Sequence, residues 1–453
     1  MTRRHSFLMI RQHQRHLYAL EFFLRGFYFS VKTTLIYIML DRGYADFSQA
    51  SKFLALFSSC YFLSPLVGSV LTDKFLGVRG ALFLGVILNL CAGCALQLAH
   101  SGAFYGALAC LLVSGGITKG NVICLMSEGA AHHKNSMRFV LLYATTNIAA
   151  FLLPNATGLM GESFGWPWAQ ALGLLLCVPP LFLLRFDWQH VRGKLLGPLL
   201  VAAQVVALYL CFYFWEHLKG AHPLFGAVLV LGVVGTAYAI RANAVTLLVM
   251  ALTALYVGFA EMIFFDLNKD ILTHMDRWIG DFQVPAAWFM TARSFFIFLI
   301  GVTLAKRQKT PHVFSKNWLM KRFSVSFSLL GVSYLLHQTG LYLNSSFVGL
   351  SMALMACGFF LNGVAEIRAV PEAIGFASSQ ASPHTHARTM GLFYGFLALG
   401  VLCAPHLNDV LLHRSPVFNF LPSATPYIHL TGALFFLSII SYTGGIFYKR
   451  VAK

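Results

Sequence analysis

Charged residues are scarce in this chain, and acidic residues are scarcer than basic ones. Only 11% of its 453 residues are Asp, Glu, Lys or Arg, whereas 58% are hydrophobic. Soluble domains carry about a quarter charged residues, so the composition excludes an ordinary soluble protein of this length. It indicates an all-α polytopic membrane protein, with the lipid bilayer as its surroundings.

Motifs for ATP hydrolysis, metal binding and redox chemistry are also missing. Neither Lys119 nor Lys194 stands in the G-x-x-x-x-G-K-[ST] pattern of a phosphate-binding loop. No group of His, Cys and acidic residues has the spacing of metal ligands. Cys91 and Cys94 have C-x-x-C spacing, but they lie in an apolar run, where cysteine is usually a packing residue. We therefore expect no metal, no other cofactor and no enzymatic activity.

Fourteen apolar segments are long enough to cross a bilayer as helices, from 17–40 to 425–448. Two of them, at 195–215 and 222–240, stand between two sets of six. The predicted domains are a six-helix bundle over 1–186, a two-helix insertion over 187–243 and a second six-helix bundle over 244–453.

The basic residues support this count. About two thirds of the 33 Lys and Arg residues fall on one predicted side of the membrane, and only a few fall on the other. Positive charge concentrates on the cytoplasmic side. We therefore expect both termini and the Ser382–His386 loop to be cytoplasmic, the Lys269–Asp281 loop to face outward, and the protein to lie in a plasma (bacterial inner) membrane. The same distribution explains the net charge of +17 without nucleic acid.

The first apolar segment carries a polar stripe of Glu21, Arg25, Tyr28 and Lys32. At roughly 100° per residue, the four side chains fall within an arc of about 60°. Each charge at the bilayer centre costs roughly 2.5–3.5 kcal/mol, so the stripe should face water or a partner. An ion pair between Glu21 and Arg25 could merely hold helices together, but it would leave Lys32 unexplained.

Further charges lie at membrane depth in other segments. We expect them to line one cavity between the two bundles, as in secondary transporters. The cations at this depth are Arg25, Lys32, Lys119, Arg293 and Arg368, and the acids are Glu21, Glu261, Glu366 and Glu372.

Some pairings can be proposed from spacing. Arg368 and Glu372 stand four residues apart and could pair on one helix. Glu261 and Arg293 have no opposite charge nearby in the sequence. Lys119 is expected to bind a carboxylate or to pair with Glu21. A group of Asp73, Lys74 and Arg79 is expected to form an inner charge clasp between helices.

Several ordered motifs carry a resemblance to a known family. The first segment resembles E-x-x-E-R-F-x-Y-Y-G-x-R, and Thr118-Lys119-Gly120-Asn121 resembles F-K-P-N. Asn147-Ile148-Ala149 resembles part of F-Y-x-x-I-N-I-G-A-F, and Glu366 with Pro371 matches G-E-x-x-x-x-P. Taken in order, these motifs resemble the proton-dependent oligopeptide transporter (POT) family of the major facilitator superfamily.

The resemblance implies the major facilitator fold and proton-coupled symport of short peptides or peptide-like solutes by alternating access. The partners would be a small solute and protons, and the protein would work as a monomer. The implied substrate-binding residues are Tyr28, Lys32, Tyr61, Lys119, Asn147, Arg293 and Glu366. The implied proton-coupling residues are Glu21, Arg25, Lys119 and Glu261.

The departures from the family pattern keep alternatives open. Leu24 replaces the second Glu of the first motif, and Arg293 stands where the family has a neutral residue. A zwitterionic peptide would place its carboxylate near Lys32 and Lys119 and its ammonium near Glu366. The surplus of cations would instead suit an anionic metabolite. Loss of the second Glu would also fit a receptor or assembly protein that no longer transports.

Overall fold

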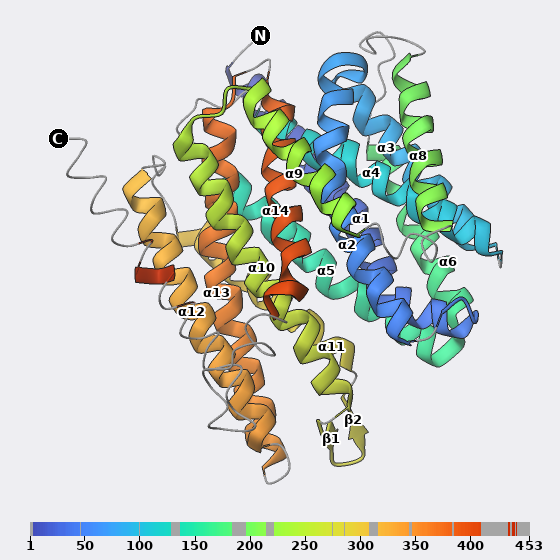
Figure 1. The fold of residues 1–453 in the computed structure, drawn as a ribbon, viewed down its shortest axis with the longest axis vertical. Helices are drawn as coiled ribbons and strands as arrows, with labels where there is room; N and C mark the ends of the chain where they lie inside the picture. The colour runs from blue at the N-terminus through green and yellow to red at the C-terminus, as the bar shows by residue number, and fades with distance from the viewer. Residues whose placement is uncertain are drawn as a thin grey trace.

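The computed structural model describes residues 3–45, 47–98, 100–127, 136–183, 196–213, 222–273, 275–284, 286–307, 316–343, 347–382 and 385–408, with 434, 437–439 and 441. Long helices make up nearly all of this part of the chain. Helices of the first half, drawn in blue to green in Figure 1, group on one side, and most of the later helices group on the other. The prediction of an all-α protein is confirmed.

The first half begins with a long helix, α1 (Arg3–Asp41), which contains the predicted segment 17–40. It continues with α2 (Phe47–Leu71), a π-helical turn η1 (Thr72–Leu76), α3 (Gly77–Leu96), α4 (Ser101–Ser127), α5 (Ser136–Phe164), α6 (Trp166–Leu176) and α7 (Pro179–Leu183). The predicted helix at 167–185 is therefore two helices. Pro179 and Pro180 explain the break, because proline has no backbone N–H to donate within a helix.

Two helices, α8 (Leu196–Tyr213) and α9 (His222–Ala239), follow at the predicted insertion. The second half contains α10 (Ala244–Thr273), α11 (Ala286–Arg307), α12 (Lys316–Leu343), α13 (Val348–Gln380) and α14 (His386–Asn408). Between α10 and α11, β1 (Trp278–Ile279) and β2 (Phe282–Gln283) form an antiparallel hairpin that we did not predict. Most of the last predicted segment, 425–448, lies outside the described residues.

Contacts between the halves run along two main helix pairs, α2 with α14 and α5 with α11. Helix α13 also contacts α5, and α9 of the insertion contacts both α2 and α14. Small residues allow the closest approaches within each half. A Cβ atom at Gly68 of α2 would collide with the backbone of Gly116 in α4, and one at Gly258 of α10 would collide with Gly400 in α14. The helices therefore pack backbone against backbone beside the polar residues of the centre.

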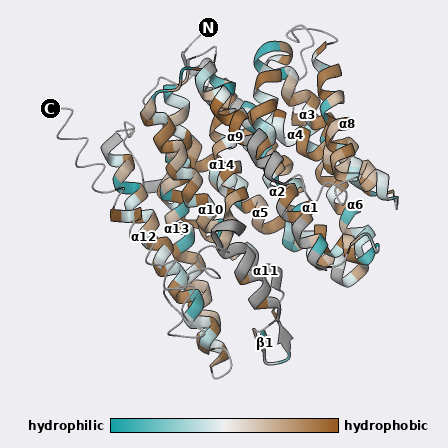
Figure 2. Ribbon diagram, viewed as in Figure 1, coloured by the Kyte–Doolittle hydropathy of each residue, from teal (hydrophilic) through white to brown (hydrophobic). Residues whose placement is uncertain are grey.

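Hydrophobic residues are frequent along most of the helices (Figure 2). Large apolar side chains such as Leu159, Phe182 and Leu231 are exposed. Within the described residues, nine helical segments are long and apolar enough to cross a membrane, and one of these runs through α2 and α3. Such a surface is stable in lipid and not in water, so the chain is an integral membrane protein.

Candidate functional site

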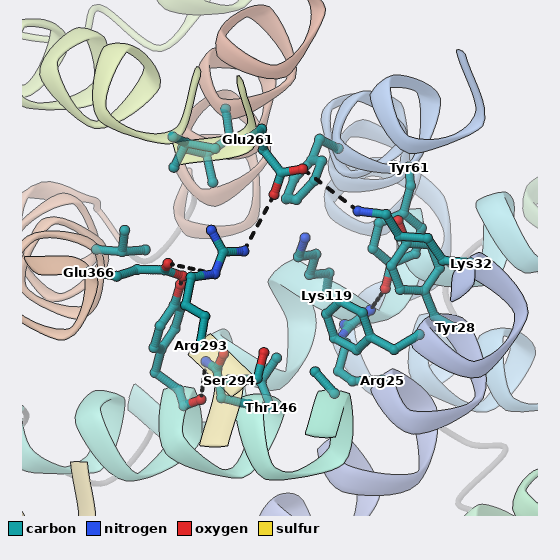
Figure 3. Close-up of a pocket in the computed structure, with 18 of the residues that line it drawn as sticks. Arg25, Tyr28, Lys32, Tyr61, Lys119, Thr146, Glu261, Arg293, Ser294 and Glu366 are labelled. Carbon is teal, nitrogen blue, oxygen red and sulfur yellow. Dashed lines mark hydrogen bonds and ion pairs between the residues drawn. The ribbon is translucent and has the colours of Figure 1, made fainter. Parts of the chain in front are cut away.

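One cavity between the two halves is lined by all ten residues of the predicted binding and coupling sites, but not by Arg368 and Glu372, which we also expected there. Its volume is about 150 Å³. About 10–15 Å³ of such space holds one water, so roughly ten waters fit. Its ionisable lining comes from α1, α4, α10, α11 and α13 (Figure 3): Glu21, Arg25, Lys32, Lys119, Glu261, Arg293 and Glu366. Tyr28, Tyr61 and Asn147 line it as well.

The stripe on α1 faces this cavity. The Arg25 Nε donates to Glu21 Oε1 at 2.8 Å, which is the predicted ion pair. A second Arg25 nitrogen donates to the Tyr61 hydroxyl on α2. Thr146 of α5 donates to the same Glu21 oxygen at 3.1 Å. Glu21 and Arg25 therefore join α1, α2 and α5 within the first half.

Glu261 on α10 is held by cations from two other helices. Its carboxylate lies 3.8 Å from Lys32 Nζ on α1 and 3.7 Å from an Arg293 nitrogen on α11. Neither cation is near Glu261 in the sequence. The fold brings both of them to this carboxylate. The Lys32 contact links the two halves, whereas the Arg293 contact lies within the second half.

Glu366 on α13 forms a second link between the halves. Its Oε1 accepts a hydrogen bond of 2.5 Å from the Tyr143 hydroxyl on α5. Its Oε2 lies 3.5 Å from Arg293 Nε. Arg293, which has no acid near it in the sequence, thus stands between two carboxylates of other helices.

Lys119 differs from the other cations of the cavity. Its ammonium lies over three aromatic rings, 4.1 Å from the centroid of Phe62, 4.3 Å from Tyr394 and 4.8 Å from Tyr61. Among the described residues it forms no ion pair, so the expected pairing with Glu21 is not formed. Figure 3 shows its side chain reaching toward the middle of the charged group. An ammonium held by ring faces alone is available to an anionic ligand.

Aromatic and amide side chains shape the wall beside Lys119. The rings of Tyr28 and Tyr61 stack with centroids 3.4 Å apart. The Asn147 amide donates to the Tyr143 carbonyl in its own helix at 2.9 Å, so its oxygen is left for other partners. These three residues line the cavity as predicted, and their roles in binding stay predictions.

Two predicted charge groupings outside the cavity are wrong. Glu372 pairs with Arg322 of α12 at 3.6 Å, and Arg368 forms no ion pair within the part of the chain that the structure describes. The packing of α12 against α13 brings Arg322 close to Glu372, although the two residues are far apart in the sequence. Asp73 pairs with Arg388 at the start of α14 at 2.9 Å, whereas Lys74 and Arg79 are exposed. The clasp therefore joins the two halves, from η1 to α14.

Several cavity residues were not in the predicted site. They include Tyr143, Thr146, Thr291, Ser294 and Tyr394. Tyr143 and Thr146 lie about one turn apart on α5, and both come shortly before the motif residue Asn147, so the 3.6-residue period could have placed them there. Tyr394 has no such signal, since it is one of many aromatic residues in apolar helices.

No protein-family model matches the chain. The chain is 21% identical to the peptide transporter YePEPT of Yersinia enterocolitica over 442 residues, which covers 86% of this chain and 85% of that protein. It is 27% identical to dipeptide and tripeptide permease A of Klebsiella pneumoniae over 239 residues, covering 48% of this chain and 46% of the permease.

Solved structures have the same fold. A peptide transporter POT in complex with sulfate superposes with a TM-score of 0.71 at 18% identity, covering 95% of this chain and 94% of the other. A POT family transporter in complex with 5-aminolevulinic acid gives 0.69 at 17% identity, covering 97% and 96%. The predicted major facilitator fold is confirmed. In sequence and in fold, the chain is therefore similar to peptide transporters, including members of the proton-dependent oligopeptide transporter family.

Proposed function

We propose that the protein is a proton-coupled symporter of short peptides or peptide-like solutes, working by alternating access. One observation carries the proposal. Seven of the described side chains that line a cavity between two helix groups are acidic or basic, and two contacts, Lys32–Glu261 and Tyr143–Glu366, cross from one group to the other. Charged side chains in the membrane interior are energetically costly, and where they occur they usually mark the path of a solute or an ion. A bound solute or proton can change the strength of the contacts that cross the cavity, and so change how easily the two halves separate.

Glu261 is the proposed proton carrier. A proton on this carboxylate removes the negative charge that attracts Lys32 and Arg293. The link between α1 and α10 is then weakened, and the two halves are free to separate on that side. Glu21 and Arg25 support this step by fixing α1 against α2 and α5.

Lys119 is the proposed anchor of the substrate carboxylate, because its charge is the one without an acid beside it in the described cavity. Lys32 adds positive potential from the facing helix. Tyr28, Tyr61 and Asn147 supply ring faces and an amide oxygen for the peptide backbone. Arg293 and Glu366 form the opposite end of the site.

Flux through purified protein in liposomes tests the function. An inward proton gradient should drive accumulation of di- and tripeptides, tested as a panel with free and with acylated amines, and an uncoupler should abolish it. Counterflow without a gradient should persist in the same vesicles. Absence of flux for the whole panel would contradict transport and favour a receptor role.

The proposed organisation is a monomer of two bundles, 1–186 and 244–453, with the insertion 187–243 between them. The packing of α9 against both α2 and α14 supports a bracing role for the insertion. We place the protein in a bacterial inner membrane with both termini cytoplasmic, on the asymmetry of Lys and Arg in the sequence.

This orientation predicts the accessibility of single cysteines in a cysteine-free variant. A cysteine at exposed Asp276, before β1, should react with an impermeant thiol reagent added to intact cells. One at position 384, which lies outside the described residues, should react only after the membrane is opened. The reverse pattern at these two positions would contradict the orientation.

The clasp between Asp73 and Arg388 should stabilise closure of the halves at the end where η1 meets α14. Asp73→Asn removes one charge of a pair at 2.9 Å, so the two halves should separate more readily there. Spin labels at exposed positions 79 on α3 and 380 on α13 should report a longer or broader distance distribution. Exchanging the charges, with Asp73→Arg and Arg388→Asp together, should restore much of the original distribution. An unchanged distribution in the single variant would show that the clasp does not hold this end.

A further inference from the structure

Arg293 occupies the end of the cavity where a substrate amine would otherwise meet acids. Its nitrogens lie 3.5 Å from Glu366 and 3.7 Å from Glu261. In the part of the chain that the structure describes, the one other carboxylate lining the cavity is Glu21, which is already bonded to Arg25 and Thr146. Both acids that could receive an ammonium are therefore neutralised by a guanidinium that belongs to the protein.

A substrate ammonium would have to displace this guanidinium or lie beside it. A group tethered close to its partner acts at an effective concentration on the order of millimolar or more. A dissolved amine must compete with that concentration, and it adds a second positive charge next to Arg293. Like charges side by side in a poorly hydrated cavity repel strongly.

The geometry of Arg293 leaves room for a different ligand. Its ion-pair distances of 3.5 and 3.7 Å exceed those of charge-assisted hydrogen bonds, about 2.7–2.9 Å. Among the described residues its side-chain N–H groups have no hydrogen-bond acceptor at bonding distance, and 17% of the side chain is exposed. Guanidinium has five N–H donors. A neutral carbonyl oxygen can therefore accept from Arg293 without disturbing either carboxylate.

The balance of charge in the cavity points the same way. Among the residues that the structure describes, four cations and three carboxylates line it, and Lys119 is the cation that forms no ion pair. A ligand with one carboxylate and no amine brings the total to zero. A zwitterion leaves the surplus charge where it was, in a region where uncompensated charge is costly.

We propose that Arg293 makes the site selective for peptide-like solutes whose amino end is blocked, such as N-acyl peptides. The inference rests on the proposed peptide transport and names its substrate class. The free carboxylate of the solute lies at Lys119, and the acyl carbonyl oxygen accepts a hydrogen bond from Arg293. Glu261 and Glu366 stay paired with Arg293 and bind no substrate amine.

Competition binding to the purified full-length protein tests the proposal with three ligands. They are Ala-Ala, N-formyl-Ala-Ala, and propionyl-Ala, which is Ala-Ala with its amine replaced by hydrogen. The third ligand removes the amine without adding bulk. In the wild type, both amine-free ligands should bind at least tenfold more tightly than Ala-Ala, and the formyl ligand should bind at least as tightly as propionyl-Ala. This comparison needs no variant.

Arg293→Gln should lower the preference for propionyl-Ala over Ala-Ala at least tenfold, because Glu261 and Glu366 then have no tethered guanidinium. Arg322→Gln is the matched control, since it also removes an arginine from a buried Arg–Glu pair but lies outside the cavity. It should keep the wild-type preference. Equal or tighter binding of Ala-Ala by the wild type would overturn the proposal and leave peptide transport standing. Failure of all three ligands to bind would instead contradict the peptide function on which the proposal rests.

Discussion

Glu261→Gln is expected to abolish pH-driven accumulation of substrate while leaving exchange of substrate across the membrane. The amide keeps the shape and hydrogen bonding of a protonated carboxyl, but it has no proton to release. In the variant, Lys32 loses its ion pair with the carboxylate on α10, and Arg293 keeps Glu366. The halves should therefore still rearrange around the substrate, but the rearrangement should no longer depend on a proton.

Two measurements on the same vesicles separate these effects. Uptake against a concentration gradient, driven by acid outside, should fall to the equilibrium level in Glu261→Gln. Counterflow of labelled against unlabelled substrate should persist. Asp276→Asn provides a control, since it makes the same change at an exposed carboxylate beside β1, and it should accumulate substrate normally. If Glu261→Gln still accumulates substrate with pH, Glu261 is not the carrier and Glu21 becomes the next candidate.

Most residues of the cavity could be predicted from the sequence because a charged side chain inside an apolar helix is visible without knowledge of the fold. Glu21, Arg25, Tyr28 and Lys32 form one stripe on a single helix, and the helical period alone shows that they share a face. Lys119, Glu261 and Glu366 each interrupt an apolar segment, and each such interruption needs a polar surrounding. All of these residues line the one cavity.

Partners across helices could not be predicted in this way. The pairs Arg322–Glu372 and Asp73–Arg388 depend on how α12 meets α13 and how η1 meets α14. The 3.6-residue repeat of a helix shows which of its residues share a face, but not which residues of another helix they contact. The same reason explains why Arg293 seemed unpaired, although it lies between carboxylates of α10 and α13. The split of the sixth helix is different, because Pro179 was visible in the sequence and its effect on the helix was overlooked.

The two contacts that cross the cavity also differ chemically. Lys32–Glu261 is an ion pair at 3.8 Å, whereas Tyr143–Glu366 is a hydrogen bond from a neutral phenol. Protonation of the carboxylate removes the Coulomb attraction of the first contact. It leaves a hydrogen bond available to the second, because a protonated carboxyl can still accept through its carbonyl oxygen. The proton should therefore loosen the α1–α10 contact more than the α5–α13 contact.

Lys119→Gln is expected to weaken binding of a carboxylate ligand by roughly 10- to 100-fold. A hydrogen bond to a charged group contributes about 1.5–3 kcal/mol, and 1.4 kcal/mol corresponds to a tenfold change in affinity. The loss should be large because the Lys119 ammonium lies over the rings of Phe62, Tyr394 and Tyr61 and has no ion-pair partner among the described residues. Binding of the carboxylate then adds its first oppositely charged partner.

A ligand whose carboxylate is converted to an amide isolates this contact. In the wild type, the amide should bind more weakly than the acid, and in Lys119→Gln the acid and the amide should bind about equally. Lys32→Gln should cost less, because Lys32 already contacts Glu261 at 3.8 Å. The exposed Lys74 serves as a control for loss of one positive charge, and Lys74→Gln should keep the wild-type preference for the acid. If Lys119→Gln kept the full preference for the acid over the amide, Lys119 would not bind the carboxylate, and Lys32 would be the next residue to test.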